Sequence, residues 1–236
     1  MPMPLPTLVV PEYECVLPFG QKVTYRPFLV REEKLLYIAM ETGDQKEMVK
    51  AVKEIIKNCT SVKKVDTLAT FDIEYLFLKI RAKSVGEVSE FKLTCPDDGE
   101  TQVDVEVNLD EVEVQVPDEH TNKVKITDDV TLVMKYPSID TFVKTNLSEN
   151  PGLEDIFQLA ADCVDQIANG EEIEDAKAYK KAELIEFFEG MNSTQFQKVQ
   201  GFFESMPKLR HTIEVFNPKT EVKSEVVLEG MAAFFA

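Results

Sequence analysis

The chain is poor in histidine and has no long apolar run, and each shortage excludes a class of function. Only two histidines occur, His120 and His211, and His120 lies in a polar stretch that predicts a solvated loop. No G-x-S-x-G, P-loop or Rossmann glycine pattern is present. No apolar run approaches the roughly 18 residues that a membrane-spanning helix requires. We therefore predict a protein that is not an enzyme and does not contact a membrane.

Cysteines are also few and widely separated. The four lie at positions 15, 59, 95 and 163, with no close pair. The first residues, Met1 to Pro6, lack the positive region and apolar core of a signal peptide. These features predict synthesis in the cytosol, reduced thiols and no cofactor. Cys59 and Cys163 fall on apolar helical faces, where we expect small core residues.

Positive charge is scarce. With 26 Lys and Arg against 43 Asp and Glu, the formal net charge is −17. A field of this sign repels phosphate backbones, which argues against a nucleic-acid partner. A basic protein partner fits the charge, but a solubilising acidic surface is the simpler interpretation.

The N-terminal half shows clear helical periodicity after a proline-rich arm at residues 1–12. A β-hairpin is predicted around Gly20, and a helix begins near Arg31 and ends at Gly43. Asp44 is placed to cap a second helix, and a third is expected between Thr70 and Gly86. The second helix carries an apolar stripe at Met48, Ala51, Val52, Ile55 and Ile56.

From residue 88 to 136 the period falls to two, which predicts a mainly β segment. The apolar positions from Ile156 to Ile167 predict a helix, and the acidic run 171–175 a turn and helix start. Helices at 181–189 and 193–204 and a hairpin around 217–220 complete the chain. The predicted fold is α+β: an N-terminal β-hairpin and helical hairpin, a β-rich middle, and a C-terminal helical bundle closed by a hairpin.

This order of elements predicts two lobes, residues 13–144 and 153–236, which meet near residues 145–152. The stretch between them combines Asn, Ser, Pro and Gly, which is typical of a linker. A single interleaved domain is the alternative.

Three stretches resemble the T-even-type phage baseplate hub family: Tyr25 to Cys59, Phe71 to Glu87, and Met206 to Leu209. The resemblance implies a non-enzymatic hub subunit or assembly factor that docks onto other baseplate hub and tail proteins. It would lie in the virion tail, and in the host cytoplasm during assembly. One alternative is a transient chaperone-like factor absent from the virion. A less favoured one is a hub-associated cell-wall hydrolase.

In many members of that family each of two hairpins carries a CxxC pair, the spacing of a zinc ribbon. This sequence keeps Cys95 and has Asp98, Asn217 and Thr220 at the other three positions. One thiolate and one carboxylate do not form a structural zinc site. The resemblance therefore implies two metal-free hairpins that keep the zinc-ribbon shape, with their tips close together.

Two segments are candidates for contacts with other proteins. Arg26, Pro27 and Phe28 lie in the arm that enters the helical hairpin, where the arginine could pair within the chain or with a neighbour. Phe234 and Phe235 form an apolar C-terminal pair that could dock on the protein's own body or on a partner. We expect Phe234→Asp with Phe235→Asp to leave the monomer folded and abolish partner binding.

Overall fold

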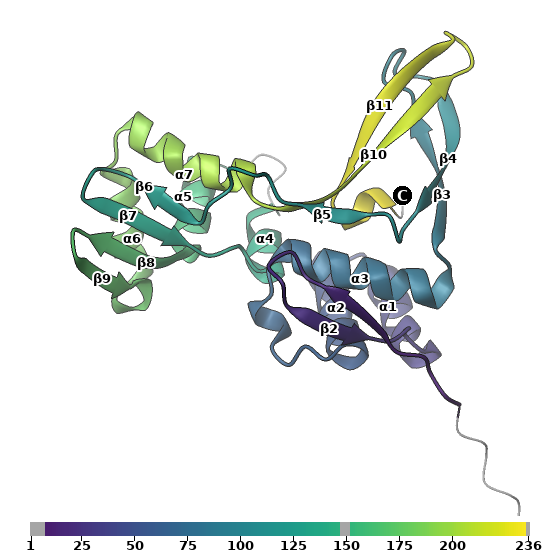
Figure 1. The fold of residues 1–236 in the computed structure, drawn as a ribbon, viewed down its shortest axis with the longest axis horizontal. Helices are drawn as coiled ribbons and strands as arrows, with labels where there is room; N and C mark the ends of the chain where they lie inside the picture. The colour runs from purple at the N-terminus through teal and green to yellow at the C-terminus, as the bar shows by residue number, and fades with distance from the viewer. Residues whose placement is uncertain (1–7, 147–151, 235–236) are drawn as a thin grey trace, which may run out of the picture. The chain divides into compact units, whose positions relative to one another are not determined.

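A computed structural model describes residues 8–146 and 152–234, and confirms a mixed α+β protein (Figure 1). The chain divides into two compact units. Unit 1 comprises residues 1–65, 72–113 and 209–236, and unit 2 comprises residues 66–71 and 114–208. Part of the predicted proline-rich arm, part of the linker and Phe235 lie outside the described residues.

Three helices form the base of unit 1: α1 (Val30–Thr42), α2 (Gln45–Cys59) and α3, which runs from Thr70 to Val85. Gly43 ends α1 in the left-handed conformation, with φ 63°, as the sequence predicts. The Asp44 side chain caps α2 by accepting a hydrogen bond from the Lys46 N–H. Most of the predicted α2 stripe is buried, together with Cys59. Burial of this apolar face stabilises the packing of the helices.

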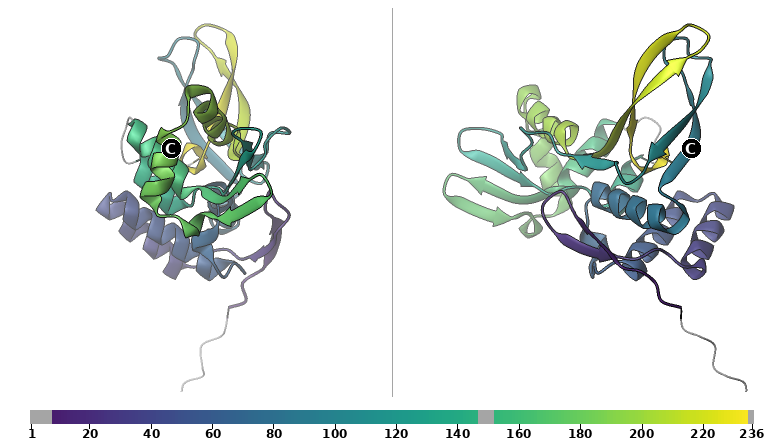
Figure 2. Two further views of the ribbon diagram at one scale, coloured as in Figure 1. Left: turned by 90° about the vertical axis from the view of Figure 1, so that its left-hand side faces the viewer. Right: turned by 45° about the vertical axis from the view of Figure 1, so that its right-hand side comes forward.

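Unit 1 also contains three antiparallel hairpins. They are β1 (Tyr13–Val16) with β2 (Lys22–Tyr25), β3 (Val88–Thr94) with β4 (Gln102–Asn108), and β10 (Lys208–Asn217) with β11 (Val222–Glu229). The last two hairpins lie side by side in both views of Figure 2, although about a hundred residues separate them in sequence. Alternation along β3 buries Ser89 and Phe91 on one face and exposes Glu90 and Lys92 on the other.

The units differ from the predicted lobes 13–144 and 153–236. Residues 114–144 belong to unit 2, and the β10–β11 hairpin and the segment after it belong to unit 1. The physical reason is the pairing of distant segments. The β10–β11 hairpin meets the β3–β4 hairpin, and the strand β8 (Val164–Asn169) pairs with the strand β7 (Val130–Met134). Neither pairing leaves a local signature in the sequence.

Unit 2 is built on a four-stranded antiparallel sheet in the order β6-β7-β8-β9. Its strands are β6 (Lys123–Lys125), β7 (Val130–Met134), β8 (Val164–Asn169) and β9 (Glu172–Asp175). Its helices are α4 (Ile139–Asn146), α5 (Leu153–Asp162), α6 (Lys181–Glu189) and α7 (Ser193–Ser205). The core joins Leu132 and Met134 of the sheet to Phe188 and Phe202 of the helices. Three short 3-10 turns, η1 (Val65–Thr67), η2 (Ala176–Ala178) and η3 (Met231–Phe234), and the strand β5 (Glu113–Gln115) complete the chain.

The predicted helix from Ile156 to Ile167 is wrong in its second half. The helix α5 ends at Asp162, and residues 164–169 form β8 between β7 and β9. Ile167 pairs with Leu132 and with Glu174, so the acidic run 171–175 is largely strand rather than a helix start. Val164 and Ile167 are three residues apart, which fits one face of a helix and not the alternation of a regular strand. The backbone pairing to two neighbours overrides this pattern, with a register shift opposite Val133 and Met134. The predicted C-terminal helical bundle is therefore a sheet-and-helix unit.

Candidate interaction sites

Arg26 ties the N-terminal arm to the helical hairpin. Its guanidinium donates to Glu32 Oε1 at 3.0 Å, to the Asn58 carbonyl at 3.0 Å and to the Pro27 carbonyl at 2.8 Å. The backbone N–H of Arg26 donates to the Cys59 carbonyl at 2.9 Å. Of the two roles considered for Arg26, the structure therefore contains the intramolecular one.

Glu32 of α1 is the centre of this arrangement, because Arg26, Arg31 and the Leu29 N–H all donate to its carboxylate, and the residue is only 1% exposed. Burial acts to raise the pKa of Glu32, but hydrogen bonds from Arg31, Arg26 and the Leu29 N–H outweigh it and hold the pKa below its usual value. The bond to the Leu29 N–H, at 2.8 Å, also satisfies a free donor at the start of the helix. The sequence left open whether Arg26 pairs within the chain, and it gave no sign that Glu32 is buried.

Pro27 and Phe28 continue the arm across unit 1. The Phe28 N–H donates to Ser84 Oγ at 2.9 Å, near the end of α3, and both Pro27 and Phe28 are half-buried. Each keeps part of its surface open to solvent. Their role in contacts with other proteins stays a prediction.

The tips of the β3–β4 and β10–β11 hairpins are joined by hydrogen bonds. Asn217 Nδ2 lies 3.1 and 3.0 Å from the two carboxylate oxygens of Asp97, and Thr220 Oγ1 also donates to Asp97. Asp98 turns inward to its own hairpin and accepts from the Glu100 and Thr101 N–H groups. The predicted proximity of the two tips is present, and Asp97, which the sequence did not single out, makes the contact.

Hydrogen bonding also sets the charge state of this tip. The Thr220 hydroxyl is the main cause that lowers the pKa of Asp97, and the Asn217 amide acts in the same direction. The Thr101 side chain and backbone hold the pKa of Asp98 far below its usual range. Both carboxylates are thus charged acceptors at neutral pH, and charge-assisted hydrogen bonds are the stronger kind.

The Phe234 side chain is buried in its own protein, with an exposed fraction of 0%. Its carbonyl accepts a hydrogen bond from Ser89 Oγ of β3 at 2.7 Å. The C-terminal segment could dock on the protein's own body or on a partner, and in the structure Phe234 is docked on the protein's own body. Phe235 lies outside the described residues.

His120 of unit 2 is engaged rather than solvated, in contrast to the prediction. Its Nδ1 lies 3.0 Å from Ser205 Oγ, and its Nε2 lies 2.9 Å from the Tyr136 hydroxyl. Ser205 Oγ donates to the Gly201 carbonyl at 2.7 Å, so Nδ1 is the donor to Ser205 and Nε2 accepts from Tyr136. Burial lowers the pKa of His120, which favours this neutral form. His120 therefore does not accept the serine proton, as a nucleophilic Ser–His pair requires.

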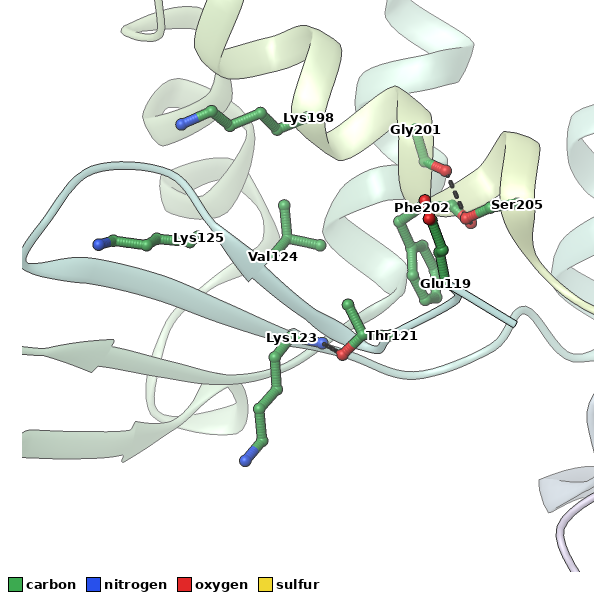
Figure 3. A pocket seen from close by; sticks show the side chains of 9 residues that line it. All are labelled: Glu119, Thr121, Lys123, Val124, Lys125, Lys198, Gly201, Phe202 and Ser205. Atoms are coloured by element: carbon green, nitrogen blue, oxygen red, sulfur yellow. Dashed lines mark hydrogen bonds between the residues drawn. The ribbon is translucent and has the colours of Figure 1, made fainter. Parts of the chain in front are cut away.

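A hollow of about 240 Å³ lies beside this histidine in unit 2 (Figure 3). Three lysines line it, but their side chains do not converge on a common point in Figure 3. Lys198 donates to the Ile126 carbonyl at 2.9 Å, and Lys125 pairs with Asp128 at 2.9 Å. The lysines are thus directed to the unit's own acceptors or to solvent, which does not suit a bound anion.

The comparison with protein families decides the relationship of this chain. The sequence matches the family described as T4 bacteriophage base plate protein over residues 10–236, nearly its whole length. The chain belongs to this family. No curated protein and no solved structure gives a significant match. For this baseplate protein, a place in the virion tail and contacts with other baseplate proteins follow from the family.

The hairpin tips of this baseplate protein do not fit a structural zinc ion. Of the four zinc-ribbon positions only Cys95 supplies a thiolate, and its side chain is buried. Asn217 and Thr220 donate hydrogen bonds to Asp97, so they occupy the space between the tips as donors and not as metal ligands. Within residues 8–146 and 152–234, no three His, Cys, Asp or Glu side chains are grouped to hold a metal.

The hydrogen bonds between the tips lead to a prediction for stability. We expect Asp97→Ala to lower the midpoint of thermal unfolding more than Glu100→Ala does, because the amide of Asn217, buried in the structure, loses its acceptor. Glu100→Ala is the matched control, since the Glu100 side chain is exposed at the same tip and forms a solvated ion pair with Lys219. Thermal unfolding measures both. Equal effects would show that the tips are not held by Asp97.

The described residues of this baseplate protein contain no helix that is both long and apolar enough to span a membrane.

Proposed function

We propose that this protein is a non-enzymatic subunit or assembly factor of the baseplate hub, which acts by docking onto other hub and tail proteins. The family match over residues 10–236 carries this proposal. The state of His120 supports the non-enzymatic part, because the Ser205 hydroxyl is committed to a backbone carbonyl. The resemblance of the Tyr25–Cys59 and Phe71–Glu87 stretches to hub proteins supports the hub rather than another part of the baseplate.

Helix α1 offers a surface for such docking. Its buried side, which includes Ala39, packs against α2. On its other side Val30, Tyr37 and Met40 are 80%, 60% and 63% exposed. A helix with apolar residues on both sides is typical of one covered on both sides. Exposed aromatic and methionine side chains are also enriched at protein interfaces.

We expect Tyr37→Ser with Met40→Ser to reduce co-purification with tail proteins at least about tenfold, because truncating buried interface anchors commonly costs more than 1.4 kcal/mol. The free energy of unfolding should change little, since both side chains face solvent. Glu41→Ser on the same helix is the control and should bind normally. Undiminished co-purification of the double variant would show that α1 is not the docking surface.

The proposal itself is tested by quantitative mass spectrometry of purified phage tails and of the soluble lysate. A fixed small-number stoichiometry in tails would establish a hub subunit. Presence only in the lysate, bound to hub precursors, would establish a transient assembly factor instead. Absence from both complexes would contradict a role in the hub. Clearing of peptidoglycan by the purified protein, lost on carboxylate substitution, would favour the hydrolase alternative.

A further inference from the structure

The segment after β11 is docked on unit 1 through a small number of defined contacts. Gly230, with φ 75°, turns the chain out of the strand, and its N–H donates to the Leu209 carbonyl at 2.9 Å. The 3-10 turn η3 follows and places Phe234 in the interior. A left-handed glycine between strand and turn is a natural pivot, because it makes the reversal without strain.

Two side chains from elsewhere in unit 1 hold this turn at its ends. Ser89 of β3 donates to the Phe234 carbonyl at 2.7 Å. Glu74 of α3 accepts a hydrogen bond from the Met231 N–H, with 3.3 Å between N and Oε1. The carboxylate also lies against Gly230, where an added Cβ would be 3.5 Å from Oε1. Glu74 is therefore an ionisable group in direct contact with both the pivot and the turn.

The surroundings of Glu74 do not favour a charge. The charged groups facing it come from the hairpin: Glu229 of β11, which pairs with Arg210 of β10. In the part of the chain that the structure describes, no lysine or arginine forms an ion pair with Glu74 itself. Burial, with a smaller contribution from Glu229, raises the pKa of Glu74 to about 7, although the Met231 N–H opposes the shift.

We propose that Glu74 is a proton-sensitive latch for the segment Gly230–Phe234: the neutral carboxyl favours the docked segment, and ionisation favours its release. Glu74 is half-buried in the docked state, so opening the segment at the Gly230 pivot exposes its carboxyl further and relieves the cost of burying its charge. The neutral carboxyl still accepts the Met231 hydrogen bond through its carbonyl oxygen. Protonation of Glu74 therefore keeps the hydrogen bond from the Met231 N–H and removes the free-energy cost of burying a charge.

The direction of the pH effect follows from linkage. In the docked state Glu74 binds its proton with a pKa of about 7, whereas the solvated carboxyl has the ordinary value of 4.5. Docking is strongest below pH 4.5 and weakens as the pH rises through this window. Between pH 6 and pH 8 the docking equilibrium should fall about tenfold. Above this window it changes no further.

Release would free Phe234 as an apolar anchor for a neighbouring baseplate protein. This consequence depends on the proposed function, but the latch itself does not. The experiment below uses the isolated chain, so a failure of the latch and a failure of the hub proposal are distinguishable.

The test is the hydrogen-exchange protection of the Met231 and Ala233 amides at pH 6 and pH 8. These amides donate to Glu74 and to the Gly230 carbonyl, respectively, in the docked turn. In the wild type, the opening equilibrium derived from protection should rise about tenfold with pH. In Glu74→Gln, which keeps an acceptor oxygen but cannot ionise, it should be constant. Glu90→Gln, at an exposed position of β3 beside Ser89, should behave as the wild type does.

A wild-type opening equilibrium that does not change with pH would overturn the proposal, and so would the same change in Glu74→Gln. A second measurement, on the wild type alone, tests the latch if Glu74→Gln does not fold. The wild-type Glu74 carboxyl can be titrated by NMR. Titration close to pH 7 supports the latch, whereas titration near pH 4.5 overturns it.

Discussion

Replacing Phe234 by alanine is expected to lower the free energy of unfolding by about 3–5 kcal/mol, the usual cost of emptying a fully buried phenylalanine site. The side chain is 0% exposed, and its backbone is held by Ser89 of β3. The loss combines the transfer of the ring to water with a cavity that the surrounding hairpins fill only in part. Urea unfolding followed by circular dichroism measures the change.

The matched control is Phe216→Ala on β10. Phe216 is 50% exposed, so its truncation should cost less than about 1 kcal/mol. An effect of Phe234→Ala as small as that of the control would show that the segment is not docked in solution. Phe234→Asp is expected to destabilise more than alanine, since it buries a carboxylate. The expectation that Phe234→Asp with Phe235→Asp leaves the monomer folded is therefore corrected by the burial of Phe234.

Glu32→Ala is the second change with a large expected effect, a loss of about 3–5 kcal/mol, as found when one partner of a buried ion pair is removed. The Arg26 side chain is only 18% exposed and would keep its charge without the carboxylate. The Leu29 N–H would also lose its acceptor at the start of α1. Urea unfolding at pH 7 measures the loss.

Two controls separate the ion pair from other effects of this change. Glu41→Ala removes an exposed acid from the same helix and should change stability by less than about 0.5 kcal/mol. Arg26→Met with Glu32→Leu removes both charges and should recover much of the stability, because apolar packing commonly replaces a buried pair without loss. If the double variant were as unstable as Glu32→Ala, the unpaired charge would not be the cause.

The ion pair of Glu32 with Arg26 also makes the stability of the protein depend on pH. Since the pKa of Glu32 in the folded protein lies below its usual value, the stability that it contributes is present above the unfolded pKa near 4.5. This contribution is lost as the pH falls through the lower, folded value. The acid sensitivity is opposite in direction to that of Glu74.

Much of the N-terminal half could be predicted from the sequence, because its signals are local. The left-handed end at Gly43 and the cap at Asp44 depend on the chemistry of single residues, and the α2 stripe depends on its own period. The strand β8 could not be predicted in this way, since its apolar spacing fits a helix and its neighbours are far apart in sequence. The boundaries of the two units could not be predicted for the same reason, because they depend on pairing between segments that are far apart in the sequence.

The candidate sites also differ in how far the sequence could predict them. The meeting of the hairpin tips was implied by the resemblance to a family that carries zinc-ribbon cysteines at the positions of Cys95, Asp98, Asn217 and Thr220, although Asp97 makes the contact. The network of His120 with Tyr136 and Ser205 joins positions up to 85 residues apart, so no local pattern indicates it. The burial of Glu32 and Phe234 is likewise a property of tertiary packing.

The composition of unit 1 from three separated stretches has a consequence for synthesis on the ribosome. Residues 114–208 of unit 2 emerge while the last stretch of unit 1, residues 209–236, has not yet been translated. The β3–β4 hairpin must therefore wait for this last stretch, because Phe234 is held by Ser89 on the face of β3 that also carries Phe91. Until then this face is open to solvent. A nascent or prematurely terminated chain cannot close this face, so only a finished polypeptide can form a complete unit 1.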